Sequence, residues 1–204
     1  MNKAFNNYAQ AAESLYTYLH GHLGMNREQL IMISDRITVR KFDRKCSVIT
    51  PGEVDHYFNF IITGAARKYV LGGKKEFTIQ LATEGHFIHD ELSFFTQKPS
   101  ECYIETIEAT EFFSIRYDDL ERLYTEMPEL NRFARLMLGE MFLKKEIRDT
   151  SYMRFTPRER FLQYVEQHPD VLQRVSQKYI ASFLHIKPET FSRLKHLLKE
   201  KGNP

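Results

Sequence analysis

The chain of 204 residues has 42% hydrophobic side chains and a net charge of +2, enough apolar material for one or two folded domains. It has no continuous apolar run of the ~18 residues that a membrane helix requires, and residues 1–10 lack the apolar stretch of a signal peptide. Its two cysteines are too few for a disulfide framework or a cysteine-based zinc site. These features predict a soluble cytoplasmic protein without a membrane partner.

The charges are unevenly distributed along the chain. Residues 151–204 contain ten Lys and Arg against five Asp and Glu, whereas residues 1–150 contain 19 against 22. The C-terminal part is therefore basic and the rest is mildly acidic. A basic terminal segment of this kind favours a polyanionic partner.

The first part of the chain combines helices with many short strands. Residues 7–34 have a helical pattern that breaks at Gly24 and restarts with a predicted cap at Asn26. Gly72-Gly73 predicts a tight hairpin, because such turns require positive φ. Short β-rich runs at this spacing predict an antiparallel β-roll, or jelly roll. The runs are ITVRKF, CSVIT, YFNFII, ARKYVL, FTIQLA, CYIETI and EFFSI.

A long helix is predicted over residues 128–153. Its apolar residues Phe133, Leu136, Leu143 and Ile147 share one face. That face fits packing onto the protein's own β-roll, and it equally fits pairing with the same helix of a second copy. The pattern leaves both interpretations open, and both can hold at once.

The C-terminal region begins with a predicted helix start at Thr156-Pro157-Arg158-Glu159, a capping box with Pro in the first turn. Residues 176–199 then predict two short helices joined by a tight turn. Ser176 can cap the first helix, and Pro188 fits the first position of the second. In the second helix the apolar side chains are expected to face inward and the polar ones outward. The inward set is Phe191, Leu194, Leu197 and Leu198, and the outward set is Glu189, Thr190, Ser192, Arg193, His196 and Lys199.

This arrangement is the helix-turn-helix pattern, although an ordinary amphipathic helical hairpin has the same spacing. Several of the polar residues suit DNA. Arg193 can donate two hydrogen bonds to a guanine, and Glu189 can accept one from a cytosine amine. Residues at the start of the first helix can hold phosphates. The predicted DNA-contacting residues are Ser176, Gln177, Lys178, Lys187, Glu189, Thr190, Ser192, Arg193 and His196.

The segment IASFLHIKPETFSRLKHLL resembles the helix-turn-helix of the Crp/Fnr family of transcription regulators. The family's recognition segment commonly reads Arg-Glu-Thr-hydrophobic-small-Arg, and this chain has Pro188 in place of the first Arg. Glu189 and Arg193 fall on the family's two base-reading positions. His185 replaces the usual Gly of the turn. The passage TPGEVDHYFNFIITGAARKYV resembles the family's strand–Gly–strand segment of the β-roll.

The resemblance covers nearly the whole chain and implies an α+β fold. It implies a cyclic-nucleotide-binding-like β-roll sensor domain with flanking helices over residues 1–127. A dimerisation helix would follow over 128–153, and a helix-turn-helix DNA-binding domain over 154–204. The implied partners are a double-stranded DNA operator, a second copy of the chain in a homodimer, RNA polymerase and a small-molecule effector of unknown identity.

The segment GHFIHDELSFF resembles the phosphate-binding cassette of cyclic-nucleotide domains, where a Gly-Glu-Leu turn and an Arg ten residues later hold the ligand. Here Glu91 matches, Asp90 replaces the Gly with an apparent one-residue insertion, and Glu101 stands where the Arg is expected. A carboxylate facing a phosphate repels it, so cyclic AMP is disfavoured. The expected effector-pocket residues are Asp90, Glu91, Leu92, Glu101, Cys102, Leu143 and Lys144, the last two at the family's purine-binding positions on the long helix.

Other sensor chemistries have weaker support. Two cysteines cannot supply the roughly four that an iron–sulfur cluster uses. Haem could bind through His86, His89 or Cys102, but both histidines are expected in a solvated loop, so no metal site is predicted. No catalytic set of residues is evident, so no enzyme is predicted. The leading function is an effector-modulated, homodimeric DNA-binding regulator. The alternative is a small-molecule-binding sensor with a vestigial DNA-binding module.

Overall fold

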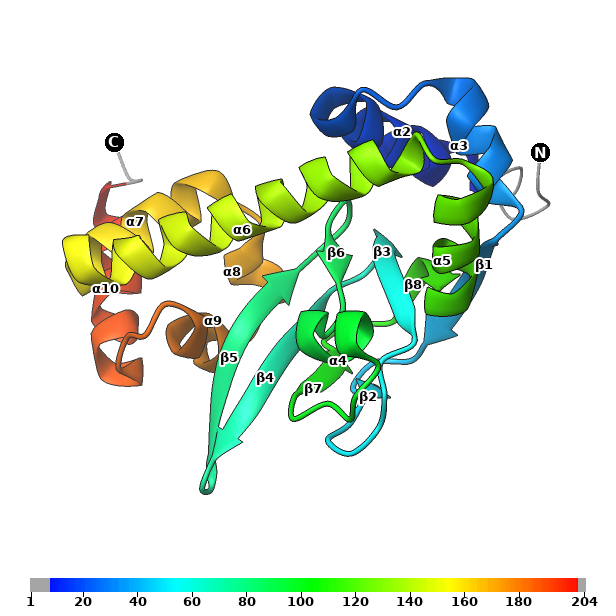
Figure 1. Ribbon diagram of the computed structural model, residues 1–204. Helices are drawn as coiled ribbons and strands as arrows, with labels where there is room; N and C mark the ends of the chain where they lie inside the picture. Colours follow the sequence, from blue (N-terminus) through cyan, green and yellow to red (C-terminus); the bar gives the residue numbers. More distant parts are fainter. Residues whose placement is uncertain (1–7, 202–204) are drawn as a thin grey trace.

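The computed structural model describes residues 8–201, and it describes the side chains of all these except residues 22–23 and 197–201. Eight strands in this part of the chain form two antiparallel four-stranded sheets that face each other as a β-roll (Figure 1). One sheet has the order β1-β8-β3-β6 and the other β2-β7-β4-β5. The strands are β1 (Ile37–Phe42), β2 (Ser47–Ile49), β3 (Tyr57–Thr63), β4 (Ala66–Gly72), β5 (Lys75–Ala82), β6 (Phe87–Ile88), β7 (Tyr103–Thr106) and β8 (Thr110–Arg116).

The predicted α+β fold with an antiparallel roll is confirmed, and each predicted β-rich run lies on a strand; only the short β6 was not predicted. Two glycines set the turns. The pairing of Gly72 with Lys75 places Gly73 and Lys74 in the hairpin turn, one residue later than predicted, and Gly73 has φ 65°. Between β3 and β4, Gly64 has φ 95°, and an added Cβ would lie 2.4 Å from the carbonyl oxygen of Ala109. Only glycine fits at that position.

The roll has one apolar core inside it and another on its outer face. Ile61, Ile88, Ile104 and Phe112 are fully buried inside the roll. The outer face of the β1-β8-β3-β6 sheet is covered by helices (Figure 1). These are α2 (Ala9–Leu23), α3 (Arg27–Ser34), α5 (Tyr117–Glu126) and the first half of α6 (Leu130–Arg154). The predicted helix break at Gly24 and the predicted cap at Asn26 are confirmed, and Asn26 forms a capping box with Gln29.

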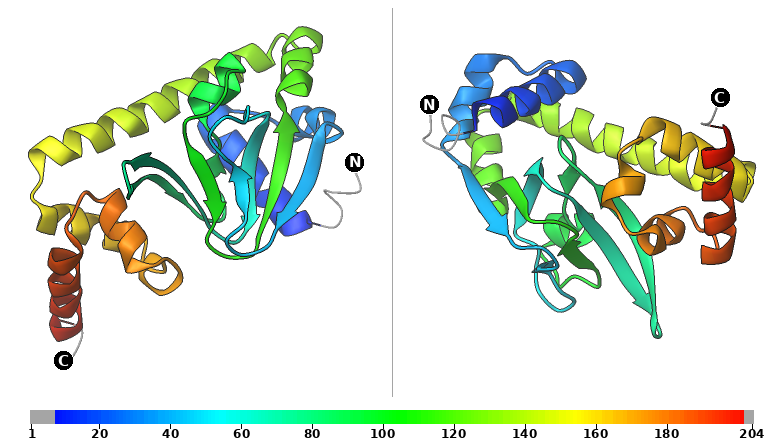
Figure 2. Two further views of the ribbon diagram at one scale, coloured as in Figure 1. Left: turned by 90° about the horizontal axis from the view of Figure 1, so that it is seen from below. Right: turned by 180° about the vertical axis from the view of Figure 1, so that it is seen from behind.

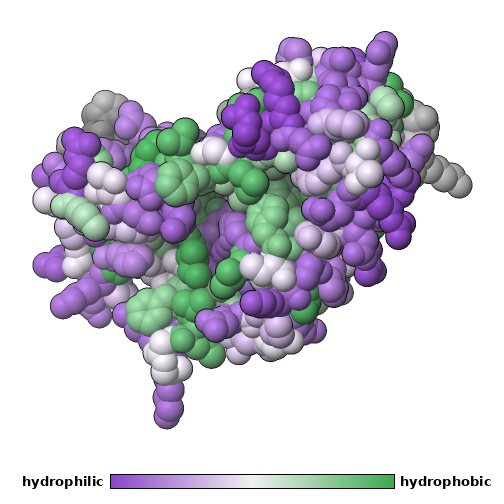
Figure 3. Space-filling view, in the orientation of Figure 1, coloured by the Kyte–Doolittle hydropathy of each residue, from purple (hydrophilic) through white to green (hydrophobic). Residues whose placement is uncertain are grey.

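The long helix α6 connects the roll to the C-terminal helices (Figure 1). The apolar face predicted for it divides between two environments. Phe133 is buried in the core under α2 and α5, and Leu136 packs partly against that core. Leu143 and Ile147 are instead 60% and 71% exposed. Figure 3 shows hydrophobic surface over α6 and over the β4–β5 hairpin, with a hollow between them.

The C-terminal helices form a separate layer at the far end of α6 (Figure 2). They are α7 (Pro157–Gln167), α8 (Val171–Arg174), α9 (Gln177–Phe183) and α10 (Pro188–Lys201). The capping box of Thr156 and Glu159 is confirmed. Ser176 does precede α9, but its side chain makes no capping hydrogen bond, so that part of the prediction is wrong. Across residues 8–201, no helix combines the length and apolar character that crossing a membrane requires.

Candidate nucleic-acid interface and sensor pocket

Helices α9 and α10 form a compact pair with a tight turn between them. Ala181 of α9 is buried, and its carbonyl oxygen accepts a hydrogen bond from the N–H of Ile186 at 2.9 Å. His185 adopts φ 53°, the left-handed conformation for which glycine is usual. Its ring packs on Tyr152 of α6, with 4.4 Å between ring centroids. The turn therefore accepts a histidine because tertiary packing holds it.

Arg160 of α7 holds this turn through hydrogen bonds to its backbone. Its guanidinium donates hydrogen bonds to the carbonyl oxygens of Leu184 at 3.1 Å, Phe155 at 2.6 Å and His185 at 3.4 Å. One arginine thus ties the end of α6 to the junction of α9 and α10. No sequence signal pointed to this residue, because a lone Arg in an amphipathic helix is ordinarily a solvated side chain.

Helix α10 separates its two faces as predicted. Phe191 and Leu194 are buried against α7 and α9, and the ring of Phe191 meets Phe161 edge-on at 5.1 Å. The polar face is open: Glu189, Ser192, Arg193 and His196 are exposed, as is Lys187 before the helix, and Thr190 is half-buried. The predictions for Leu197, Leu198 and Lys199 lie outside the described side chains. Figure 2 shows α10 projecting from the end of the molecule.

Helix α9 is docked on the β-roll rather than free. The hydroxyl of Ser182 accepts a hydrogen bond from the N–H of Thr78 at 2.9 Å and donates one to the carbonyl oxygen of Glu76 at 3.2 Å. Lys178, a predicted phosphate contact, forms an ion pair with Glu76 at 3.3 Å. Ser176 and Gln177 are exposed. Strand β5 therefore packs directly against helix α9.

Two arginines strengthen this docking. Arg67 of β4 is buried, with its guanidinium 3.9 Å from the ring centroid of Tyr69 and 3.7 Å from that of Tyr179 on α9. Arg174 of α8 forms ion pairs with Glu84 at 2.8 Å and with Glu108 at 3.0 Å, both on the roll.

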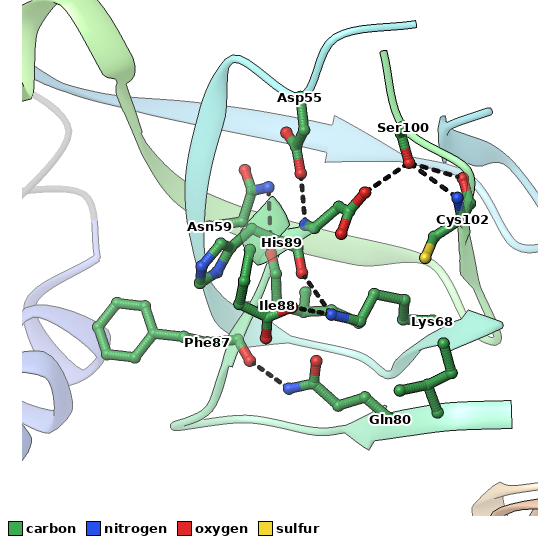
Figure 4. A network of polar contacts seen from close by, with 12 residues as sticks. Asp55, Asn59, Lys68, Gln80, Phe87, Ile88, His89, Ser100 and Cys102 are labelled. Atoms are coloured by element: carbon green, nitrogen blue, oxygen red, sulfur yellow. Dashed lines mark hydrogen bonds and ion pairs between the residues drawn. The ribbon is translucent and has the colours of Figure 1, made fainter. Parts of the chain in front are cut away.

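The cassette region lies at the other side of β4 and is a closed polar network (Figure 4). The carboxylate of Asp55 accepts a hydrogen bond from the N–H of Asp90 at 2.7 Å. The hydroxyl of Ser100 donates to Asp90 at 2.7 Å and accepts from the N–H of Cys102 at 2.9 Å. Asp55, Asp90 and Ser100 are buried, so their polar groups are satisfied by one another.

A buried cation completes the network. Lys68 of β4 forms an ion pair with Glu91 and donates a hydrogen bond to the carbonyl oxygen of His89 at 3.1 Å. Burial alone would raise the pKa of Glu91, but attraction to Lys68 outweighs it and keeps that pKa below its ordinary value. The carboxylate of Glu91 therefore stays ionised at neutral pH. Glu91, the residue expected to meet a ligand, is already bound to the protein itself.

Lys68 and Arg67 were both missed in the sequence, yet the run ARKYVL contains a signal for them. Successive side chains of a strand point to opposite faces. Two neighbouring charged residues in a central strand therefore require a polar partner on each side. The structure supplies Glu91 of the cassette for Lys68. For Arg67 it supplies Glu76 and Glu105 on the neighbouring strands, with the ring of Tyr179 beside them.

Several predicted pocket residues lie elsewhere than expected. Leu92 is exposed, and so is Glu101, in the segment before β7. That Glu101 faces a bound anion stays a prediction; the buried cation of the cassette is Lys68, and its ion-pair partner is Glu91. Cys102 is half-buried, and burial raises the pKa of its thiol to about 11. A thiol that stays protonated is a poor metal ligand.

The two pocket residues predicted on the long helix, Leu143 and Lys144, have other surroundings in the structure. Leu143 is exposed. Lys144 forms an ion pair with Glu140 of its own helix at 2.5 Å, and its ammonium lies 5.7 Å from the ring centroid of Tyr18 on α2. Within one chain, these two residues are therefore not brought together with Glu91.

His89 corrects a further expectation. His86 is exposed, as a loop residue should be, but His89 is only 1% exposed. Its ring packs against Phe58, Phe94 and Phe95 at 4.2, 5.5 and 6.1 Å between centroids. Burial lowers its pKa to about 4. Neither ring nitrogen has a hydrogen-bond partner among the described residues. The described residues contain no group of three or more His, Cys, Asp or Glu that could hold a metal ion.

A comparison with protein families bears on the roll and the cassette together. Residues 39–127 match the family model of the cyclic nucleotide-binding domain. No curated protein is detectably similar to the chain in sequence. The match spans β1 to the end of α5, so it includes the turn that contains Glu91.

Solved structures extend the similarity to the whole fold. CLP of Xanthomonas campestris, a c-di-GMP responsive global regulator, is 15% identical, with 87% of this chain and 93% of CLP covered and a TM-score of 0.65. FixK2 of Bradyrhizobium japonicum is 18% identical, with coverages of 81% and 86% and a TM-score of 0.67. The Thermus thermophilus catabolite activator protein is 17% identical, with coverages of 93% and 88% and a TM-score of 0.56. At these identities the chains share a fold.

Proposed function

We propose that the protein is a homodimeric, sequence-specific, DNA-binding transcription regulator of the Crp/Fnr type whose activity an effector modulates. The observation that carries this proposal is the polar face of α10. Glu189, Ser192, Arg193 and His196 are exposed on one side of a helix whose other side is anchored by Phe191 and Leu194. A rigid helix that presents unpaired polar side chains at the end of a molecule suits insertion into a major groove.

The similar structures support this proposal, since CLP is described as linking cell–cell signalling to virulence gene expression. We also propose the corresponding division of the chain into a sensor (1–127), a dimerisation helix (128–153) and a DNA-binding domain (154–204). RNA polymerase is the expected protein partner of such a regulator.

Selection of binding sites from random duplex DNA tests the proposed activity. The full-length protein should enrich a motif with two-fold symmetry and half-sites about 34 Å apart. The alternative, a sensor with a vestigial DNA module, predicts weak retention on heparin at low salt and no enriched motif. An enriched symmetric motif decides for the regulator without knowledge of the effector, and weak retention on heparin favours the alternative.

Dimerisation would use the exposed half of α6. Phe142, Leu143 and Ile147 form an apolar patch there, at 61%, 60% and 71% exposure, and such patches mark interaction surfaces. In a two-fold dimer the same patch would serve both copies. Replacing Leu143 and Ile147 by Asp should give monomers in sedimentation that no longer bind a symmetric operator. A dimer of unchanged mass would place the interface elsewhere.

Cyclic AMP is not the proposed effector. Glu91 is paired with Lys68, and the described cassette offers Ser100 and the exposed Glu101 where the resemblance implies an Arg. An anionic ligand would have to break that pair to be held. In calorimetry, cyclic AMP and cyclic GMP should bind no better than about millimolar, or roughly −4 kcal/mol. Micromolar affinity for either would show that Lys68 can exchange Glu91 for a phosphate.

A further inference from the structure

An apolar cavity of about 120 Å³ lies outside the roll, between its β1-β8-β3-β6 sheet and the helices α2, α5 and α6. It is beneath the first half of α6, where α2 and α5 meet that helix (Figure 1). It is distinct from the cassette, which is formed by β4, β6, α4 (Glu91–Thr96) and the segment before β7.

The lining of the cavity is apolar throughout. Phe58 and Phe87 contribute from the strands, Leu19 from α2, Leu123 from α5, and Met137 and Met141 from α6. Every lining side chain is aliphatic or aromatic, and the hydroxyl of Tyr124 is the one polar side-chain group among them. Water needs two to four polar partners to remain in such a space. The cavity therefore disfavours water and any charged ligand.

The size of the cavity fits a definite class of molecule. An engineered cavity of about 150 Å³ lined by Leu, Ile and Phe stays dry and binds benzene. We propose that this cavity is a binding site for a small, uncharged, apolar molecule about the size of a single aromatic ring. We propose further that this molecule is the effector in the function proposed above, on which that second step depends.

The cavity lies against α6, so a bound molecule can influence the DNA-binding end of the protein through this helix. Met137, Leu138 and Met141 line it, and the exposed patch of Phe142, Leu143 and Ile147 begins on the next residue. Close-packed cores respond to added volume by moving rather than compressing. An occupant that displaces α6 would therefore shift the patch and also Arg148, which hydrogen-bonds to the carbonyl oxygen of Ile79 at 2.6 Å.

The buried His89 supports an uncharged occupant. Its ring lies against Phe58, which forms part of the cavity wall. A neutral imidazole behind that wall supplies no charge that could attract an ion into the cavity. The paired Lys68 and Glu91 lie beyond His89 and neutralise each other.

Methionine methyl groups report directly on occupancy. In full-length protein labelled with ¹³C at the methionine methyls, benzene should shift the signals of Met25, Met137 and Met141, which line the cavity. It should leave those of Met32 and Met153, which are exposed. Benzoate, which has the same ring with a charge, should shift none of them. Benzene that leaves the three lining signals in place, or benzoate that moves them equally, overturns the proposal.

Filling the cavity provides a second test. Ala134→Leu and Leu120→Phe each add volume at a lining position, and either should abolish the benzene-dependent shifts. Leu162→Phe, a matched addition on α7, should leave them unchanged. Two variants are used because one of them could disturb folding. If benzene still shifts the lining methionines in both folded variants, the site lies elsewhere.

The regulatory step has its own readout. With the selected operator, benzene should change the affinity of the wild-type protein at least about fivefold, and Ala134→Leu should remove that change. Methionine shifts with an unchanged operator affinity would refute the effector role alone. If the protein binds no operator either with or without benzene, the proposed function fails, and the methionine signals still decide whether the cavity is a site.

Discussion

The cassette and the outer face of α10 are both rich in polar side chains, but those of the cassette are mostly buried and those of α10 are exposed. In the cassette, Asp55, Asp90 and Ser100 are buried and bonded to one another, and Lys68 holds Glu91. On α10, Glu189 and Arg193 are exposed at the end of the molecule. A region whose polar groups satisfy each other has little to offer a polar ligand, whereas an open polar face is ready for a partner.

This contrast predicts that substitutions in the cassette act on stability and those on α10 act on DNA binding.

Glu91→Gln should lower the free energy of unfolding by about 3 kcal/mol, because it leaves the buried ammonium of Lys68 without its carboxylate. Glu101→Gln, a matched change at an exposed position, should cost less than about 0.5 kcal/mol. Urea unfolding of both variants measures the difference. Equal stabilities would mean that the cassette is solvated and open to ligands, which would end the contrast.

Protonation of His89 should make the free energy of unfolding depend on pH. Its pKa is about 4 in the folded protein, against an ordinary value of 6.5. Above pH 6.5 it is neutral in both states and contributes no pH dependence. As the pH falls from 6.5 toward 4, His89 binds a proton in the unfolded chain but not in the folded protein. The free energy of unfolding therefore falls by up to about 3 kcal/mol.

The variant His89→Leu isolates this contribution, because it removes the titrating ring from its aromatic surroundings. Unfolding free energies measured from pH 7.5 to 4 should fall less steeply for the variant than for the wild type. Parallel curves would show that His89 is protonated in the folded protein and has a partner that compensates its charge.

Arg193→Ala should weaken operator binding by roughly 1–3 kcal/mol and relax the preference at one base pair per half-site, while leaving the unfolding free energy nearly unchanged. Arg158→Ala, at an exposed arginine of α7, should leave the sequence preference intact. Fluorescence anisotropy with the operator and its single-base variants distinguishes the two. Weakening that is uniform over all sequences would assign Arg193 to phosphate.

Lys178→Ala should have the smallest effect, below about 1 kcal/mol in 0.1 M salt. A phosphate contact would weaken all duplexes evenly and reduce the slope of log affinity against log salt by about one. Because Lys178 is paired with Glu76 in the free protein, part of any gain from phosphate is offset by loss of that pair. An unchanged salt slope would show that Lys178 stays on the roll when DNA is bound.

The sequence predicted what depends on local pattern. The strands, the capping box at Thr156, the long helix and the two faces of α10 all follow from periodicity and turn chemistry. It failed where the partner of a side chain is distant in the chain. Lys68 meets Glu91 across 23 positions, and Arg67 meets Tyr179 across more than a hundred. No periodicity reports such pairings.

The sequence pattern also failed to predict which side chains would be exposed. The alternation of apolar residues in α6 is similar in both halves, yet Phe133 is buried in its own chain and Ile147 is left open. Likewise, His86 and His89 were both expected in a solvated loop, yet His86 is exposed and His89 is buried. The strand β6, which ends at the residue before His89, is only two residues long, too short to give an alternating signal.

The contact between the roll and the C-terminal helices should affect thermal unfolding and the ability of the C-terminal helices to fold apart from the roll. Ala65 and Ile107 of the roll share a buried cluster with Phe161, Ile180 and Phe191. A unit of about 50 residues buries too little surface to be robust alone, and here part of the core of the C-terminal helices belongs to the β-roll. Heating should therefore give one cooperative transition rather than two, and residues 154–204 transplanted onto a different sensor should fold poorly unless that sensor presents an equivalent apolar surface.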